Sequence, residues 1–302
     1  MSTVQFTLCG REGRELIALA LLESRLFDPY LEKGRVLFKG SATVSCLTRR
    51  LVDTPLRICG RITARGMKGP LRPSEGAHFL LYQGGEVTSV DGSAGEVLKT
   101  FGPGDLFVTG ANALDSFGHA ALLIGSPGGG GYGECMGALY TEGFRTLILS
   151  SAAKLIPGDL TRLYSQVSRK SCDYSYGMAC SLAPVPGEVI TETQALALFA
   201  QVEALIFARG GHTGAEDALA IQVSGERDQV EKVLDLVERV KALPDSPMGE
   251  EDSEAECAFP CSSCGPHLSC RYAGKQRVYL NKKSAKEKSI ENLQKSEEGR
   301  RG

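Results

Sequence analysis

Two glycine-rich turns carry residue types that bind small anions. Gly40-Ser41-Ala42-Thr43 follows the apolar run RVLFK (35–39), and the loop from Ser126 to Gly131 follows AALLI (120–124). A helix beginning after such a turn offers free N–H groups and a favourable dipole, and hydroxyl side chains add donors. We therefore expect both turns to frame one small-molecule site, with an ordinary capped turn and a flexible loop as the alternatives. The candidate binding residues in these turns are Gly40, Ser41, Thr43, Gly128, Gly129, Gly130 and Gly131.

A second group able to do chemistry is a cluster of cysteines near the end of the chain. Cys257, Cys261, Cys264 and Cys270 have the spacing C-x3-C-x2-C-x5-C, with His267 among them. Four thiolates suit Zn²⁺ or an iron–sulfur cluster, and a metal would anchor a segment that has little core of its own. Zinc is favoured because the spacing differs from the common ferredoxin run. The alternative is a metal-free segment with reactive thiols.

The elements that must position these residues alternate between strand and helix. Short, nearly continuous apolar runs are typical of strands buried on both faces, as in parallel sheets. They occur at 35–39, 55–59, 77–82, 105–109, 120–124 and 145–149, and helical stretches occur at 42–52, 92–99, 133–142 and 159–168. This alternation predicts an α/β fold with a doubly wound, mainly parallel sheet.

The pattern changes after residue 180. A helix at 192–202 precedes strands at 204–208 and 218–223, and a helix follows in which Val230, Val233, Leu234, Val237 and Val240 share one face. This order predicts a small ferredoxin-like α+β unit. The predicted organisation is an α/β ligand-binding domain (1–180, beginning with a helix at 14–27), the small unit (181–243), and a third segment (244–302). That last segment comprises an acidic linker, the cysteine cluster and a charged, partly disordered tail.

The motifs of the α/β region resemble a known superfamily. They are Gly40-Ser41-Ala42-Thr43, Thr109-Gly110-Ala111-Asn112-Ala113-Leu114-Asp115, Gly128 to Gly131, and Lys154-Leu155-Ile156-Pro157. In order and spacing this set is similar to the sugar-phosphate isomerase and CoA-transferase-like superfamily. That superfamily includes ribose-5-phosphate isomerases, the lactate-utilisation (LUD) proteins and initiation-factor-2B-like isomerases. The resemblance covers roughly residues 35–165. It implies a site for a phosphorylated sugar, a CoA thioester or an organic acid, in an isomerase or a transferase.

Departures from the family pattern argue against a copied isomerase mechanism. Asn112 stands where the isomerases have an aspartate, and Pro127 where they have a lysine. Asp115 matches their second aspartate, and Glu134 is a loose counterpart of their acid–base glutamate. These two carboxylates are the candidate catalytic residues, for proton transfer or for a nucleophilic glutamate. Alternatively, Asp115 is a β-turn residue and Glu134 complements a helix dipole.

Other residues complete the predicted site with smaller roles. Gly110 and Asn112 would help to bind substrate, and Lys154 would contact it, although a solvated loop lysine is the favoured interpretation. For His119, a structural role is favoured over a catalytic one. Cys135 is a candidate nucleophile, because a thiolate in the first turn of a helix is stabilised.

Composition limits the class of function. The formal net charge of −2 gives no reason to expect a nucleic-acid partner, and no apolar run reaches the 18 residues that a membrane span needs. The N-terminus lacks a secretory leader, so we expect a cytoplasmic protein with reduced cysteines. Two hypotheses follow. One is an isomerase or CoA-transferase-like enzyme. The other is a non-catalytic, LUD-like accessory that senses a metabolite or transfers electrons, with a metal or a protein partner at its tail. A homo-oligomer is compatible with both.

The cysteine cluster yields a direct prediction. Protein purified without oxygen is expected to carry zinc, or iron with sulfide, because four thiolates hold such ions. Elemental analysis would measure the content in the natural chain and in a C261S/C264S variant, which should lose the metal, and in a C9S control, which should keep it. A natural chain free of both metals would contradict the prediction.

Overall fold

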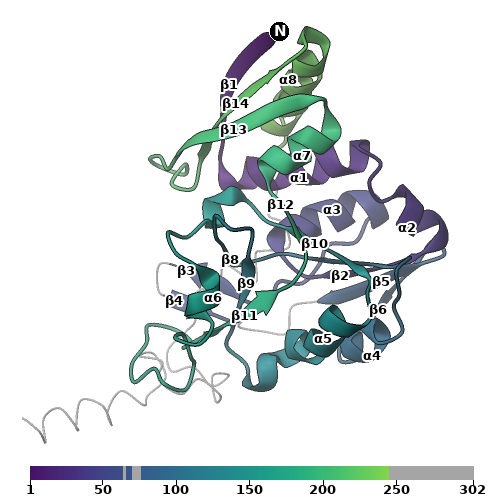
Figure 1. The fold of residues 1–302 in the computed structure, drawn as a ribbon, viewed down its shortest axis with the longest axis vertical. Coiled ribbons are helices and arrows are strands. Elements are labelled where there is room, and N and C mark those ends of the chain that lie inside the picture. Colours follow the sequence, from purple (N-terminus) through teal and green to yellow (C-terminus); the bar gives the residue numbers. More distant parts are fainter. Residues whose placement is uncertain (64–65, 70–75, 245–302) are drawn as a thin grey trace, which may run out of the picture.

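The computed structural model describes residues 1–63, 66–69 and 76–244. Figure 1 shows a large α/β body with a smaller sheet and its helix at one end. Among the described residues, no helix is both long enough and apolar enough to cross a membrane.

The body is built on a mixed, largely parallel sheet of six strands. The order is β12-β10-β7-β2-β5-β6. The first four strands run parallel, and the last two join antiparallel at the other edge. The strands are β2 (Arg35–Lys39), β5 (Phe79–Gln83), β6 (Glu86–Ser89), β7 (Leu106–Thr109), β10 (Arg145–Leu149) and β12 (Glu188–Ile190).

Helices cover both faces of this sheet, which explains the continuous apolar runs in its strands. On one face lie α1 (Gly10–Glu23), α3 (Ala42–Val52) and α7 (Glu192–Phe199); on the other lie α4 (Ala94–Leu98) and α5 (Gly130–Thr141). Strand β2 shows the two-residue alternation directly: Val36 and Phe38 pack in the first core, and Leu37 packs in the second. By the same alternation, Lys39 faces the side of α4 and α5.

Beyond the carboxyl end of β7 the chain forms a second, antiparallel sheet. Its order is β11-β9-β8, and a short hairpin lies near it, as Figure 1 shows. The elements of this region are β3 (Arg61–Thr63), β4 (Gly66–Lys68), β8 (Ala113–Leu114), β9 (Ala120–Ile124), η1 (Pro127–Gly129), η2 (Ala152–Lys154), α6 (Leu160–Leu163) and β11 (Ser181–Val185).

The smaller sheet joins the two ends of the described chain. Strand β14 (Leu219–Gly225) pairs antiparallel with β13 (Val202–Arg209) on one side and with β1 (Ser2–Leu8) on the other. Helix α8 (Arg227–Lys241) covers one face with its apolar stripe, and α2 (Asp28–Lys33) precedes β2 in the body. The sequence pattern predicts β13, β14 and α8 but gives no sign of β1. The predicted domain boundary at residue 180 does not separate the small sheet from the six-stranded sheet. Strand β1, before the boundary, belongs to the small sheet, and β12, after it, belongs to the six-stranded sheet.

The α/β class is confirmed, and the elements at 35–39, 42–52, 120–124 and 145–149 have the predicted bounds. The prediction of a parallel strand is wrong in two places. Strand β5 is antiparallel to β2, and β9 belongs to the second, antiparallel sheet. A continuous apolar run indicates only that a strand is buried, and a buried strand can run parallel or antiparallel to its neighbour. Residues 55–59 form no strand. The helix predicted at 159–168 is only the single turn of α6, in which Leu160 is the one buried residue.

The core predicts where a substitution would destabilise the chain. Leu47 of α3 is fully buried in the larger core, so Leu47→Ala should lower the free energy of unfolding by about 2–5 kcal/mol. Leu205 of β13 is 50% exposed, and Leu205→Ala should change it by less than about 1 kcal/mol. Chemical denaturation measures both, and similar losses in the two variants would contradict this packing.

Candidate functional site

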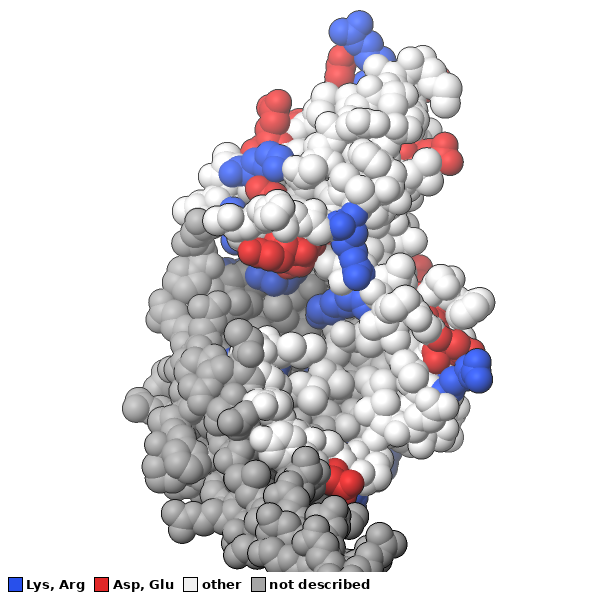
Figure 2. Space-filling model, turned by 90° about the vertical axis from the view of Figure 1, so that its left-hand side faces the viewer, with Lys and Arg blue, Asp and Glu red and all other residues white. Residues whose placement is uncertain are grey.

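The carboxyl ends of the parallel strands collect polar residues at one edge of the sheet. Lys39 ends β2, Thr109 ends β7, and Ser150 and Thr191 follow β10 and β12; all four are buried. Figure 2 shows that this side of the molecule is hollowed between the small sheet and the body, with basic and acidic side chains around the hollow. In open α/β sheets this edge is where ligands bind.

The first glycine turn lies at this edge and packs tightly. The Ser41 hydroxyl accepts a hydrogen bond from the N–H of Val44 and caps α3. Gly110, after β7, packs on Ser41, since a Cβ there would lie 2.5 Å from the Ser41 Oγ. Gly40 is needed because a Cβ would lie 2.1 Å from the Arg57 carbonyl oxygen. This turn therefore serves mainly as an N-cap and a close contact between two strand ends.

The second glycine turn has a different physical origin. Gly128, Gly129 and Gly130 all have positive φ, which side chains with a Cβ rarely adopt, and Gly128 and Gly129 have open space around them. Gly131 is needed for space, because a Cβ would lie 2.8 Å from the Phe79 ring. The turn leads into α5, which has no side-chain cap. The N-terminus of this twelve-residue helix thereby lies at the start of β5, where Gly131 packs on Phe79.

Lys39 lies beside that helix N-terminus. It is only 7% exposed, and its Nζ is 5.9 Å from the centre of the Tyr132 ring in the first turn of α5. Within the described ranges no carboxylate or other hydrogen-bond acceptor contacts this ammonium. Burial lowers the pKa of Lys39, and the nearby Cys59 and Cys135 thiols offset this in part. A buried cation without a counter-ion is costly, so the position favours an anion.

A second group of charges lies at the same edge. The Lys154 ammonium donates to the Ala111 carbonyl oxygen at 2.6 Å, and burial with the nearby Arg14 lowers its pKa to about 8. Glu192, at the start of α7, is fully buried, and burial raises its pKa. Its Oε2 accepts from the N–H of Ala152 at 2.9 Å, whereas its Oε1 has no partner. Among the residues that the structure describes, the buried Nε of Arg14 also has no hydrogen-bond partner.

These positions correct one expectation and supply residues that the motifs missed. Lys154 is not a freely solvated loop lysine, since it is half-buried and its ammonium donates to the Ala111 carbonyl oxygen. Lys39, Arg14 and Glu192 were not predicted. The one sequence signal that could have found Lys39 is a lysine that ends an otherwise apolar strand directly before a glycine turn.

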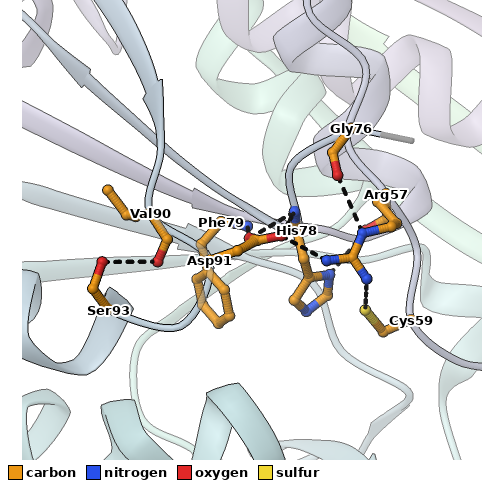
Figure 3. A network of polar contacts seen from close by, with 8 residues as sticks. All are labelled: Arg57, Cys59, Gly76, His78, Phe79, Val90, Asp91 and Ser93. Carbon is orange, nitrogen blue, oxygen red and sulfur yellow. Dashed lines mark hydrogen bonds and ion pairs between the residues drawn. The ribbon is translucent and has the colours of Figure 1, made fainter. Parts of the chain in front are cut away.

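An ionic network fixes the segment beside Lys39 (Figure 3). The Asp91 carboxylate accepts from the Arg57 guanidinium at 2.6 Å and from the backbone N–H groups of His78 and Phe79 at 2.9 and 2.7 Å. A second guanidinium nitrogen of Arg57 contacts the Cys59 Sγ at 3.3 Å. Side-chain contacts therefore help to hold residues 55–59, which form no strand.

His78 stands between this network and the first glycine turn. Burial and then the Lys39 ammonium lower its pKa to about 4, so it is neutral near pH 7. Its Nδ1 lies 2.9 Å from the Arg57 carbonyl oxygen, and the neutral ring donates there. His78 thus adds no charge next to Lys39.

The two predicted catalytic carboxylates lie on different elements. Asp115 is buried in the turn between β8 and β9 and accepts hydrogen bonds from its own turn and from α6. Glu134 is exposed on α5, on the side that packs against α4: a Cβ on Gly95 would lie 2.6 Å from the Glu134 carbonyl oxygen. Asn112 binds the β9 backbone, since its Oδ1 accepts from the N–H of Leu123 at 3.0 Å.

Of the two predictions about cysteines, the structure describes the residue of only one, Cys135. Cys135 is fully buried and donates to the Gly131 carbonyl oxygen, and burial raises its pKa to about 12. It is therefore a thiol, and the prediction of a stabilised thiolate is wrong. Cys257, Cys261, Cys264 and Cys270 lie outside the described residues.

The neutral state of His78 predicts a pH dependence. Its folded-state pKa, about 4, lies below its ordinary value of 6.5, so the unfolded chain takes up the proton first. The free energy of unfolding should then fall by up to about 3 kcal/mol as the pH drops from 6.5 to 4. Denaturation across this range should show a shallower fall in His78→Gln and an unchanged fall in the His212→Gln control. The same pH slope in all three proteins would show that His78 contributes nothing.

The chain was also compared with known proteins. No family model, no curated protein and no solved structure matches it. The resemblance drawn from the sequence motifs therefore stays a prediction.

Proposed function

We propose that this protein binds a small anionic metabolite at the carboxyl edge of its parallel sheet. The observation that carries the proposal is Lys39, a cation 7% exposed that has no acidic partner among the described residues. The ligand's anionic group would lie between the Lys39 ammonium and the N-terminus of α5. A phosphate or a carboxylate fits this environment, because helix N–H groups and an ammonium group both donate to its oxygens.

The surrounding charges support the same ligand class. Lys154 and Arg14 add positive charge to this edge, and the Glu192 carboxylate offsets part of it. Each cation lowers the pKa of Lys154, which shows that their charges are unfavourable together. An anion would relieve this repulsion and would raise the pKa of Lys154 again. The predicted ligands, a phosphorylated sugar, a CoA thioester or an organic acid, all carry such a group.

The backbone of the second glycine turn fits this ligand as well. Gly128 and Gly129 have positive φ, and a Cβ added at either would meet nothing within 4 Å, so the turn exposes backbone that a ligand could approach closely. Lys39 and this turn come from segments about ninety residues apart in the sequence, and the sheet brings them together.

Calorimetric titration with inorganic phosphate, ribose 5-phosphate and acetyl-CoA tests the proposal. At least one should bind, and Lys39→Met should weaken that binding about 10- to 100-fold, as expected for a lost charged hydrogen bond. Because the substitution removes a buried charge, the variant should unfold at the same temperature or higher.

Lys99→Met is the matched control. Lys99 is 57% exposed and pairs with Glu96, so its loss should leave the affinity unchanged. Equal affinity in the Lys39→Met variant, or no binding of any of the three probes to the natural chain, would refute the proposal.

A further inference from the structure

A separate cavity lies beyond the sheet edge, beside the turn between β8 and β9. Its volume is about 200 Å³, and apolar side chains of Leu114, Leu155 and Val189 form part of its wall. Thr191 and Gln194, at the start of α7, supply polar groups on another side. The cavity is large enough for a molecule of a few carbon atoms and is smaller than the usual range of about 300–1,000 Å³ for drug-sized ligands.

Asp115 and His119 also line this cavity, and their geometry is that of a general base. The side chain of Asp115 is fully buried, whereas that of His119 is 43% exposed. The Asp115 Oδ2 lies 2.8 Å from the His119 Nδ1. A hydrogen bond there places the proton on Nδ1 and leaves the Nε2 lone pair able to accept a proton.

The surroundings of Asp115 keep its carboxylate charged. Burial would raise its pKa, but hydrogen bonds from Leu160, His119 and Phe117 together hold it below the ordinary value. The Oδ1 accepts from the backbone N–H groups of Phe117 and His119, each at 2.9 Å, and the Oδ2 also accepts from the N–H of Leu160 at 3.0 Å. A charged, immobile carboxylate stabilises the imidazolium that forms when Nε2 takes a proton.

We propose that Asp115 and His119 form a catalytic dyad that hydrolyses small esters held in this cavity. The Nε2 of His119 takes a proton from a water molecule, whose oxygen forms a bond to the ester carbonyl carbon. The bond between that carbon and the leaving oxygen then breaks, and the leaving alkoxide takes the proton back from the imidazolium. The products are one acid and one alcohol, and no other reactant is needed.

Gln194 is placed to bind the ester carbonyl. Its Oε1 accepts from the backbone N–H and the hydroxyl of Thr191, which fixes the amide and leaves its NH₂ group as the donor. The three apolar side chains would contact a short acyl chain. The proposal is independent of the anion site, because an ester needs no charged group.

A metal ion is the other occupant that these residues suggest, since Asp159 also lies near Asp115 and His119. The hydrogen bonds argue against it. A carboxylate has about four lone-pair positions, and backbone N–H groups already occupy three of those of Asp115, two on Oδ1 and one on Oδ2, which leaves one position for a metal. The charged and titratable groups that face the dyad are Asp159 and Tyr164.

Hydrolysis of p-nitrophenyl acetate by the full chain is the test. The natural protein should hydrolyse it faster than buffer, and His119→Gln should lower that excess rate about 100-fold or more, the usual contribution of a general base. His212→Gln, which alters an exposed loop histidine, should keep the full rate. Equal rates in the two variants would overturn the proposal, as would loss of the rate on adding EDTA.

A second measurement does not depend on a variant that folds. Nitrogen chemical shifts of the labelled histidines should show the neutral His119 ring protonated at Nδ1 and unprotonated at Nε2. In Asp115→Asn, if it folds, this preference should weaken together with the rate. The opposite tautomer in the natural chain would overturn the dyad. Failure of these tests leaves the anion titrations unaffected, since the ester probe carries no charge.

Discussion

Lys39 imposes the main constraint on this structure, because a charged group ends the central strand of a sheet that is buried on both faces. Removing an ammonium from water costs on the order of several kcal/mol unless a partner compensates. Around Lys39 the described chain offers an aromatic ring, two thiols and a helix N-terminus, and none of these carries a negative charge in its ordinary state. Two neighbouring basic side chains add no unpaired positive charge beside Lys39. His78 is held neutral, and Arg57 is paired with Asp91.

The glycine turn before α5 places the start of that helix beside Lys39. Its three positive-φ residues let the chain reverse sharply after β9 and start a helix without a side-chain cap. Gly131 and Gly133 are required for space, so the whole run is explained by backbone geometry and close contacts. That explanation accounts for the glycines, and it also places a helix N-terminus without a side-chain cap beside a buried cation.

The small sheet is tied to the same region. The Arg209 guanidinium of β13 donates to the carbonyl oxygens of Ala153 and Leu155, which flank Lys154. The Asp217 carboxylate accepts from the N–H of Gly10 at the start of α1, the helix that carries Arg14. The small sheet therefore holds the two segments that carry the second group of charges, while the hairpin of β8 and β9 supplies one wall of the cavity of Asp115 and His119.

Local patterns in the sequence determined most elements and the α/β class, because apolar periodicity and turn residues act over a few positions. The runs at 35–39 and 42–52 and both glycine turns are examples. Strand direction, the pairing of β1 with β14 and the second sheet depend on contacts between distant segments, which no local pattern encodes. The same holds for the sites. The sequence indicated that the glycine turns and Asp115 matter, but only the tertiary structure decided that Asp115 and Glu134 lie on different elements. It also placed Lys39, Arg14, Lys154 and Glu192 at one edge, because burial and missing partners exist only once the chain is folded.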